Sequence, residues 1–165
     1  MKEMWDKKAA SYPRFTGEPS EFQRGLYAKI TEFGVKFENK SVVDIGCGTG
    51  VHTLFLAQIC REITGMDISG EMLKVMLEDA VKFNISNLTA VQSDFKNFNP
   101  NRVYDVAFST MSPAIADEED FVKFINLGEK RVYLWWNKPR YSSVLELFYE
   151  GSHRGCFKEK ANFFE

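Results

Sequence analysis

Short apolar runs alternate with amphipathic segments along most of this chain, and the alternation predicts strands joined by helices. Strands are expected at residues 41–45, 62–68, 88–94, 103–110 and 131–136. Helices are expected at residues 51–60, 69–84, 117–126 and 142–150. This order favours a doubly wound α/β fold, in which a mostly parallel sheet lies between two layers of helices as a three-layer α/β/α sandwich.

Two further helices, at residues 4–11 and 21–33, are expected before the first strand. They stand outside the alternation, so we expect them to cover the open side of a pocket. We interpret the 165 residues as one domain, with an N-terminal helical lid at residues 1–40 and an α/β core at residues 41–165. No segment is apolar for long enough to act as a signal peptide or to span a membrane, which favours a cytoplasmic protein.

A glycine-rich turn follows the first strand, in the sequence VVDIGCGTG at residues 42–50. Gly46, Gly48 and Gly50 alternate with single residues, and a predicted helix begins directly after them. Glycine lets a turn fold tightly and lets a ligand approach the main chain, at the strand end where open α/β sheets bind ligands. A turn that needs only positive φ angles would contain the same glycines, so the motif by itself leaves both interpretations open.

Acidic residues mark the carboxyl ends of three successive predicted strands. Asp44 lies two residues before the first glycine, Asp67 lies at the end of the second strand, and Asp94 ends the third. A carboxylate at the position of Asp67 can accept two hydrogen bonds from a ribose diol, and its charge strengthens both. The glycine spacing is GxGxG and not the GxGxxG of dinucleotide folds, so a nucleotide-cofactor oxidoreductase is the weaker alternative.

The combination of DIGCGTG, GMDIS and QSDF resembles the class I S-adenosylmethionine-dependent methyltransferase family, over residues 41–136. The resemblance implies a Rossmann-like methyltransferase fold, S-adenosylmethionine as the cofactor and S-adenosylhomocysteine as the product. It implies these cofactor-binding residues: Tyr12, Asp44, Gly46, Cys47, Gly48, Gly50, Asp67, Ile68, Met72, Asp94, Phe95 and Ser109. Carboxylates suit this ligand because it carries a sulfonium cation, an ammonium group and a diol.

The resemblance also implies what each residue contacts. The three glycines would wrap the methionine and ribose parts of the cofactor. Asp44 would approach the methionine amino group, and Asp67 would hold the ribose hydroxyls. Cys47 is a small residue that fills the turn rather than a nucleophile. Tyr12 lies in WDKKAASYPRF, which is similar to the segment that precedes the core in small-molecule methyltransferases, and it is the candidate lid residue.

The remaining implied contacts concern the adenine and the reacting end of the site. Ile68 and Met72 would pack on the adenine ring. Asp94 would accept a hydrogen bond from the adenine amino group, beside the backbone of Phe95. Ser109, near the end of the fourth strand, would face the methyl donor or the acceptor.

The expected reaction makes small demands on the protein. Methyl transfer is an in-line displacement at a carbon that the sulfonium already activates, so the protein supplies alignment and exclusion of water. No residue pattern identifies a catalytic base, and the catalytic residues are left unassigned. No metal site is expected, because the three cysteines lack a CxxC spacing and the histidines and acids form no ligand pattern. A module that binds the cofactor without transferring its methyl group is the alternative function.

The acceptor is expected to be a small molecule. The formal net charge is −2 and no long basic run is present, which argues against nucleic acid as the partner. Relatives that methylate amino groups often have an Asn-Pro-Pro-aromatic turn after the fourth strand. This chain has Ser112, Pro113 and Ala114 there, which disfavours methylation of nucleic-acid bases or glutamine.

The end of the chain departs from the family pattern. Two further strands usually complete the family's sheet, whereas one predicted helix follows the fifth strand here before residue 165. A sheet without those strands has an exposed edge. We therefore expect that the chain continues past residue 165, that this form is shortened, or that a partner such as a second copy in a homodimer covers the edge.

Overall fold

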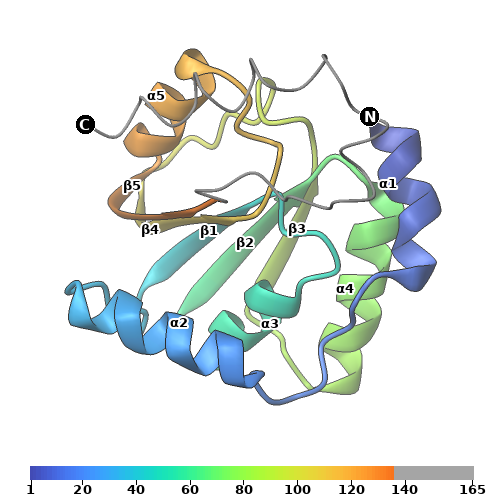
Figure 1. Ribbon diagram of the computed structural model, residues 1–165, viewed down its shortest axis with the longest axis horizontal. Helices are drawn as coiled ribbons and strands as arrows, with labels where there is room; N and C mark the ends of the chain where they lie inside the picture. The colour runs from blue at the N-terminus through green and yellow to red at the C-terminus, as the bar shows by residue number, and fades with distance from the viewer. Residues whose placement is uncertain (136–165) are drawn as a thin grey trace, which may run out of the picture. The chain divides into compact units, whose positions relative to one another are not determined.

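A sheet of five parallel strands forms the centre of the structure (Figure 1). The computed structural model describes residues 1–135, of which residues 1–134 form one unit. The strands are β1 (Ser41–Ile45), β2 (Glu62–Asp67), β3 (Leu88–Gln92), β4 (Tyr104–Thr110) and β5 (Gly128–Leu134). Their spatial order is β3-β2-β1-β4-β5, so the direction of winding reverses between β1 and β4. The parallel, doubly wound sheet predicted from the sequence is confirmed.

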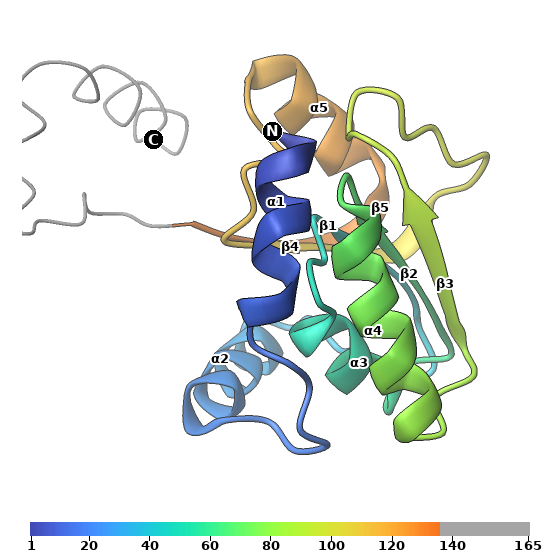
Figure 2. The ribbon, with the colours of Figure 1, turned by 90° about the vertical axis from the view of Figure 1, so that its right-hand side faces the viewer.

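Helices cover both faces of this sheet, as Figures 1 and 2 show. The helices α2 (Glu21–Glu32), α3 (Val51–Ala57) and α4 (Gly70–Lys82) lie on one face, and α5 (Glu118–Asn126) lies on the other. The side chains of a strand alternate between the two faces. In β1, Val42 packs in the cluster that contains Leu56 of α3, whereas Val43 packs in the cluster that contains Phe124 of α5. Three layers result, with an apolar core on each side of the sheet.

Side-chain caps fix where several helices begin. The hydroxyl of Ser69 accepts a hydrogen bond from the Met72 N–H at 3.2 Å, at the start of α4. Ser20 and Gln23 form a reciprocal capping box at the start of α2. Cap motifs of this kind involve residues that are close together in the sequence. No helix within residues 1–135 is both long enough and apolar enough to cross a membrane.

Some predicted boundaries are wrong, for identifiable reasons. The first helix is α1 (Lys2–Lys8), and Ala9–Ser11 continues it as a turn of 3-10 helix. The fifth strand begins at Gly128 rather than at residue 131, and it ends at Leu134. A Cβ atom at Gly128 would lie 2.5 Å from the Ala107 nitrogen, so glycine here permits close pairing with β4 in addition to ending α5. The predicted helix at 142–150 lies outside the described residues.

Candidate functional site

The glycine turn after β1 is shaped mainly by the protein's own packing. Gly46, Gly48 and Gly50 have φ angles of 71°, 56° and 78°, in the left-handed region that favours glycine. A Cβ atom at Gly46 would lie 1.7 Å from the Ser112 hydroxyl oxygen, and one at Gly50 would lie 2.3 Å from Cγ of Met76. At Gly48 the nearest atom would be 3.9 Å away. Gly48 is therefore the one glycine of the three at which a Cβ atom would not clash with the protein.

Hydrogen bonds hold this turn across the end of β2. The N–H groups of Gly46 and Cys47 both donate to the Met66 carbonyl, at 2.8 and 3.0 Å. The Gly48 N–H donates to Oδ2 of Asp67 at 2.8 Å. The turn lies at the carboxyl end of the sheet, beside the reversal between β1 and β4 where such sheets bind ligands.

Asp67 is the acid that the structure brings closest to the glycine turn. Oδ2 of its carboxylate accepts from Gly48, and Oδ1 accepts from the Ser69 N–H at 2.9 Å. Its side chain is largely buried, and this burial raises the pKa of Asp67 despite the backbone donors. Each oxygen retains a further lone pair, so the carboxylate can still accept hydrogen bonds from a ligand diol.

Asp44 lies beneath the turn and is only 3% exposed. Oδ2 of Asp44 accepts a hydrogen bond from the Thr53 hydroxyl of α3 at 2.6 Å. Burial raises the pKa of Asp44 to about 7, and the negative charge of Asp67 adds to the rise while the Thr53 hydrogen bond opposes it. Asp44 and Asp67 thus form one electrostatic unit, in which a nearby cation would favour ionisation of both.

Asp94 lies apart from this unit. β3 ends at Gln92, so Asp94 is in the following loop, where its side chain is exposed. Its two carboxylate oxygens accept from the backbone N–H and the side-chain amide of Asn97, both at 2.8 Å. The Asn97 backbone N–H is the main reason that the pKa of Asp94 is lowered. In this structure Asp94 caps its own loop, and the implied contact with adenine stays a prediction.

The three other residues that the resemblance places near the adenine differ in how deeply they are buried. Ile68 is half-buried at the end of β2, and Met72 is buried in the first turn of α4. Phe95 is buried in the apolar cluster on the α5 side of the sheet, together with Phe98 and Phe124. The resemblance gave Phe95 a role through its backbone, and a buried ring is compatible with that role.

The remaining implied site residues have identifiable partners in the structure. Ser109 is fully buried, and its hydroxyl donates to the Ile45 carbonyl at 2.9 Å, joining the ends of β4 and β1. The Cys47 sulfur packs over Gly65 of β2, and burial raises its pKa well above the usual value, which keeps the thiol protonated. Within residues 1–135, no group of three or more histidines, cysteines or acids is placed to hold a metal ion.

The N-terminal segment reaches the same end of the sheet. The ring of Tyr12 lies over Gly48 and makes an edge-to-face contact with Trp5, with ring centres 6.1 Å apart. Oδ1 of Asp6 accepts from the Ser69 hydroxyl at 2.6 Å. Sequence reasoning missed Asp6 and Thr53, because both are defined by contacts across the fold and neither has a local signal.

His52 lies in the first turn of α3, and its surroundings argue against a role as a base. Nδ1 of His52 lies 2.8 Å from the Tyr27 hydroxyl of α2. Burial lowers the pKa of His52 to about 4 and raises the pKa of Tyr27 above its usual value. Both groups are therefore neutral near pH 7. With the tyrosine hydroxyl donating to Nδ1, the ring proton is on Nε2, which then acts as a donor.

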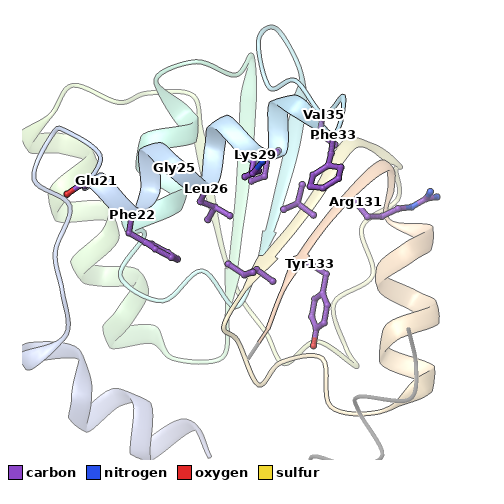
Figure 3. Close-up of a pocket in the computed structure, with 12 residues that line it drawn as sticks. Glu21, Phe22, Gly25, Leu26, Lys29, Phe33, Val35, Arg131 and Tyr133 are labelled. Atoms are coloured by element: carbon purple, nitrogen blue, oxygen red, sulfur yellow. The ribbon is translucent and has the colours of Figure 1, made fainter. Parts of the chain in front are cut away.

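A broad apolar groove of about 830 Å³ lies elsewhere, between α2 and β5 (Figure 3). Its walls include Leu26 of α2 and Val132 of β5, and Tyr133 stands at one side of it. No residue of the glycine turn and none of the three acids lines this groove. We place the candidate cofactor site at the glycine turn, because the carboxylates and open main chain needed to hold a cationic diol lie there.

Comparisons with known proteins agree with this assignment. A family model described as a methyltransferase domain matches residues 42–127, more than half of the chain. An uncharacterized protein of Haemophilus influenzae is 29% identical over 133 residues, which make up 79% of this chain and 48% of that protein. Ribosomal RNA small subunit methyltransferase A of Mesomycoplasma hyopneumoniae is 27% identical over 66% of this chain and 44% of its own length. The chain thus spans less than half the length of these two relatives.

A solved structure shows the same fold. The phosphoethanolamine N-methyltransferase 1 of Haemonchus contortus was solved in complex with phosphoethanolamine and S-adenosylhomocysteine. It matches with a TM-score of 0.62 and 19% identity, over 86% of this chain and 34% of that chain. The motifs, the sheet order and the family match lead to one conclusion: this chain belongs to the methyltransferase domain family, the class I S-adenosylmethionine-dependent methyltransferases that its sequence resembles.

Proposed function

We propose that this chain is an S-adenosylmethionine-dependent methyltransferase that acts on a small-molecule acceptor. One observation carries the proposal: Asp67 accepts hydrogen bonds from Gly48 and Ser69 beneath an open stretch of main chain, with buried Asp44 as its electrostatic partner. Two carboxylates below a glycine turn suit a ligand that carries both a diol and cationic groups.

The residues at the turn fit this cofactor by their chemistry. Asp67 has free lone pairs for the ribose hydroxyls, since each of its oxygens holds one backbone donor. Asp44 is buried with the Thr53 hydroxyl as its hydrogen-bond partner, so an ammonium group nearby would restore its charge. The methionine part would lie beside Gly48, between the glycine turn and the ring of Tyr12.

In this mechanism the cofactor, when bound, supplies a methyl group that its sulfonium has already activated. The chain's own residues bind and orient the cofactor, and they exclude water from the site. Tyr12 lies over Gly48 and would shield the reacting end from solvent. His52 is neutral, and its Nε2–H is a hydrogen-bond donor, so no general base is assigned. A methyl acceptor whose reacting atom already has a free lone pair needs no base.

The negative charge of this chain supports the proposal that the methyl acceptor is a small molecule. The net charge is −2, and the first turn of α5 begins with acids directly after the β4 loop: Asp117, Glu118, Glu119 and Asp120. A nucleic-acid partner would instead need basic residues at the site. The relative from Mesomycoplasma hyopneumoniae is an RNA methyltransferase, so the choice of acceptor needs an experiment of its own.

Calorimetry with S-adenosylhomocysteine tests cofactor binding. We expect Asp67→Asn to weaken binding by about 10- to 100-fold, because an amide loses the charge that strengthens both diol hydrogen bonds. Glu62→Gln is the matched control, since Glu62 begins the same strand and its carboxylate pairs with Arg102 at the opposite end of the sheet. Equal affinities of the two variants would contradict the proposed site.

A second experiment tests transfer and the class of acceptor. The protein is incubated with S-adenosylmethionine labelled in its methyl group, together with either a small-metabolite extract or total RNA. Label in a small molecule supports the proposal, and label in RNA alone contradicts the acceptor class. Binding without any labelled product would favour the alternative of a module that holds the cofactor without transferring its methyl group.

A further inference from the structure

The helix α1 is held to the rest of the described chain by few polar contacts. None of its residues is buried, and it lies alongside α4 (Figure 2). Within residues 1–135, both hydrogen bonds that join it to the start of α4 end on one carboxylate. Oδ1 of Asp6 accepts from the Ser69 hydroxyl at 2.6 Å and from the Glu71 N–H at 3.5 Å. The attachment of α1 to α4 thus depends strongly on Asp6.

Ser69 connects this attachment to the candidate cofactor site. Its hydroxyl donates to Asp6, while its backbone N–H donates to Oδ1 of Asp67 at 2.9 Å. Oδ2 of Asp67 in turn accepts from the Gly48 N–H. A continuous path of hydrogen bonds therefore runs from α1, through the first turn of α4, to the glycine turn. The Asp6 carboxylate lies at the N-terminus of α4, and the partial positive charge of a helix N-terminus favours a negative group there.

The segment that follows α1 is anchored by different contacts. The Thr49 hydroxyl donates to the Pro13 carbonyl. Arg14 forms an ion pair with buried Asp79 of α4, with 2.7 Å between Nη2 and Oδ1. Phe15 is buried in the cluster beneath α4. Residues 13–15 thus stay attached whether or not Asp6 is bonded to Ser69.

Tyr12 lies between the two attachments. Its ring lies over Gly48, and it contacts Trp5 of α1. Tyr12 therefore contacts both the glycine turn and α1. An element that is anchored at one end and held at the other mainly through one carboxylate can exist in two states, attached and released.

We infer that Asp6 is a positioning residue of the cofactor site: its bond to Ser69 holds α1 against α4 and so keeps Tyr12 over Gly48. Release of this bond uncovers the glycine turn for cofactor entry and exit, and its formation retains the bound cofactor. The cofactor part of this inference rests on the proposed function, whereas the attachment itself does not.

The first test concerns the attachment in the protein without ligand. Hydrogen exchange of the amides in residues 2–8 is compared among the full chain, Asp6→Asn and Glu3→Gln. Glu3 is the matched control, because it lies in the same helix and its change removes the same charge without touching Ser69. We expect exchange to rise about 10-fold in Asp6→Asn and to change less than about twofold in Glu3→Gln. Equal exchange in the two variants would overturn the inference.

The second test measures binding of S-adenosylhomocysteine and S-adenosylmethionine by stopped-flow and calorimetry. We expect Asp6→Asn to raise the dissociation rate of both ligands about 10-fold, with the unfolding midpoint of the free protein unchanged. An equal loss for both ligands indicates positioning, because only S-adenosylmethionine carries a charge on sulfur. A loss confined to S-adenosylmethionine would instead show that Asp6 acts as a charge, and it would overturn the inference.

A double-mutant cycle tests the path through Ser69. Ser69→Ala also removes the cap of α4, so its effect by itself is ambiguous. If Asp6 acts through Ser69, adding Asp6→Asn to Ser69→Ala leaves the dissociation rate unchanged. If the effects of the two substitutions on the dissociation rate are fully additive, Asp6 does not act through Ser69, and the inferred path is wrong. If the unmodified chain binds neither ligand, the proposed function fails, and the exchange comparison still decides whether Asp6 holds α1.

Discussion

The Thr53 hydroxyl donates a hydrogen bond of 2.6 Å to Asp44 beneath the glycine turn, and both side chains are buried. Thr53 belongs to α3 and Asp44 to β1, so this contact joins the helix that follows the turn to the strand that precedes it. Burial raises the pKa of Asp44, and this hydrogen bond is the contact that opposes the rise. The ionisation of Asp44 near neutral pH therefore depends on Thr53.

Replacing Thr53 by valine should weaken S-adenosylmethionine binding at pH 7. The pKa of Asp44 then rises beyond about 7, because burial is no longer opposed, and the neutral acid attracts the ligand's ammonium group less. We expect a loss of about 3- to 10-fold at pH 7 that disappears by pH 9, measured by calorimetry. Thr31→Val, which removes an exposed hydroxyl from α2, is the control. A loss that is the same at both pH values would contradict this explanation.

Asp44→Asn should stabilise the free protein at alkaline pH. The pKa of Asp44 is about 7 in the folded state and about 3.8 when unfolded, so its contribution to stability is complete below about pH 3.8 and is lost as the pH rises to 7. The loss amounts to about 4 kcal/mol. Asparagine keeps an acceptor for Thr53 and has no charge to bury. Urea unfolding at pH 5 and pH 8 measures the difference, and a variant whose relative stability does not rise with pH would contradict it.

His52→Gln should show the opposite dependence on pH. The pKa of His52 is about 4 in the folded state and about 6.5 when unfolded, so its contribution is complete above pH 6.5 and is lost as the pH falls towards 4. The loss is about 3 kcal/mol, and glutamine avoids it while still accepting from Tyr27. The stability of the natural chain relative to the variant should therefore fall between pH 6.5 and 4. A constant difference over that range would show that His52 is not buried as a neutral group.

Alanine at two of the glycines should separate folding from binding. Gly46→Ala places a methyl group on Ser112, and we expect it to cost more than about 2 kcal/mol of unfolding free energy. Gly48→Ala meets no atom within 3.9 Å, so its cost should be limited to about 1 kcal/mol for the left-handed backbone. Its main effect should be on cofactor binding. Denaturant unfolding and calorimetry give the two quantities for each variant.

A second change checks the reason given for Gly46. Ser112→Gly should recover part of the stability that Gly46→Ala loses, because it removes the hydroxyl and the Cβ atom that overlap the new methyl group. It should not improve Gly48→Ala. Equal recovery in both variants would indicate that backbone strain alone determines the cost.

Local sequence features predicted most of the fold. Strands and helices were found because apolar periodicity reflects which side of an element is buried, and this information lies within a few neighbouring residues. The start of β5 was missed, because Gly128 reads equally well as the end of a helix and as a point of close strand pairing.

The sequence by itself determined the order of the elements, the parallel sheet and the family, since periodicity and the glycine motif are local. Only the tertiary structure decided which polar groups meet. It places Asp44 and Asp67 close enough for their charges to interact, and it brings Asp6 to Ser69 across a separation of 63 residues. The physical reason is that a side chain's partner depends on strand order and on where each strand ends. Neither property is encoded in the residues adjacent to it.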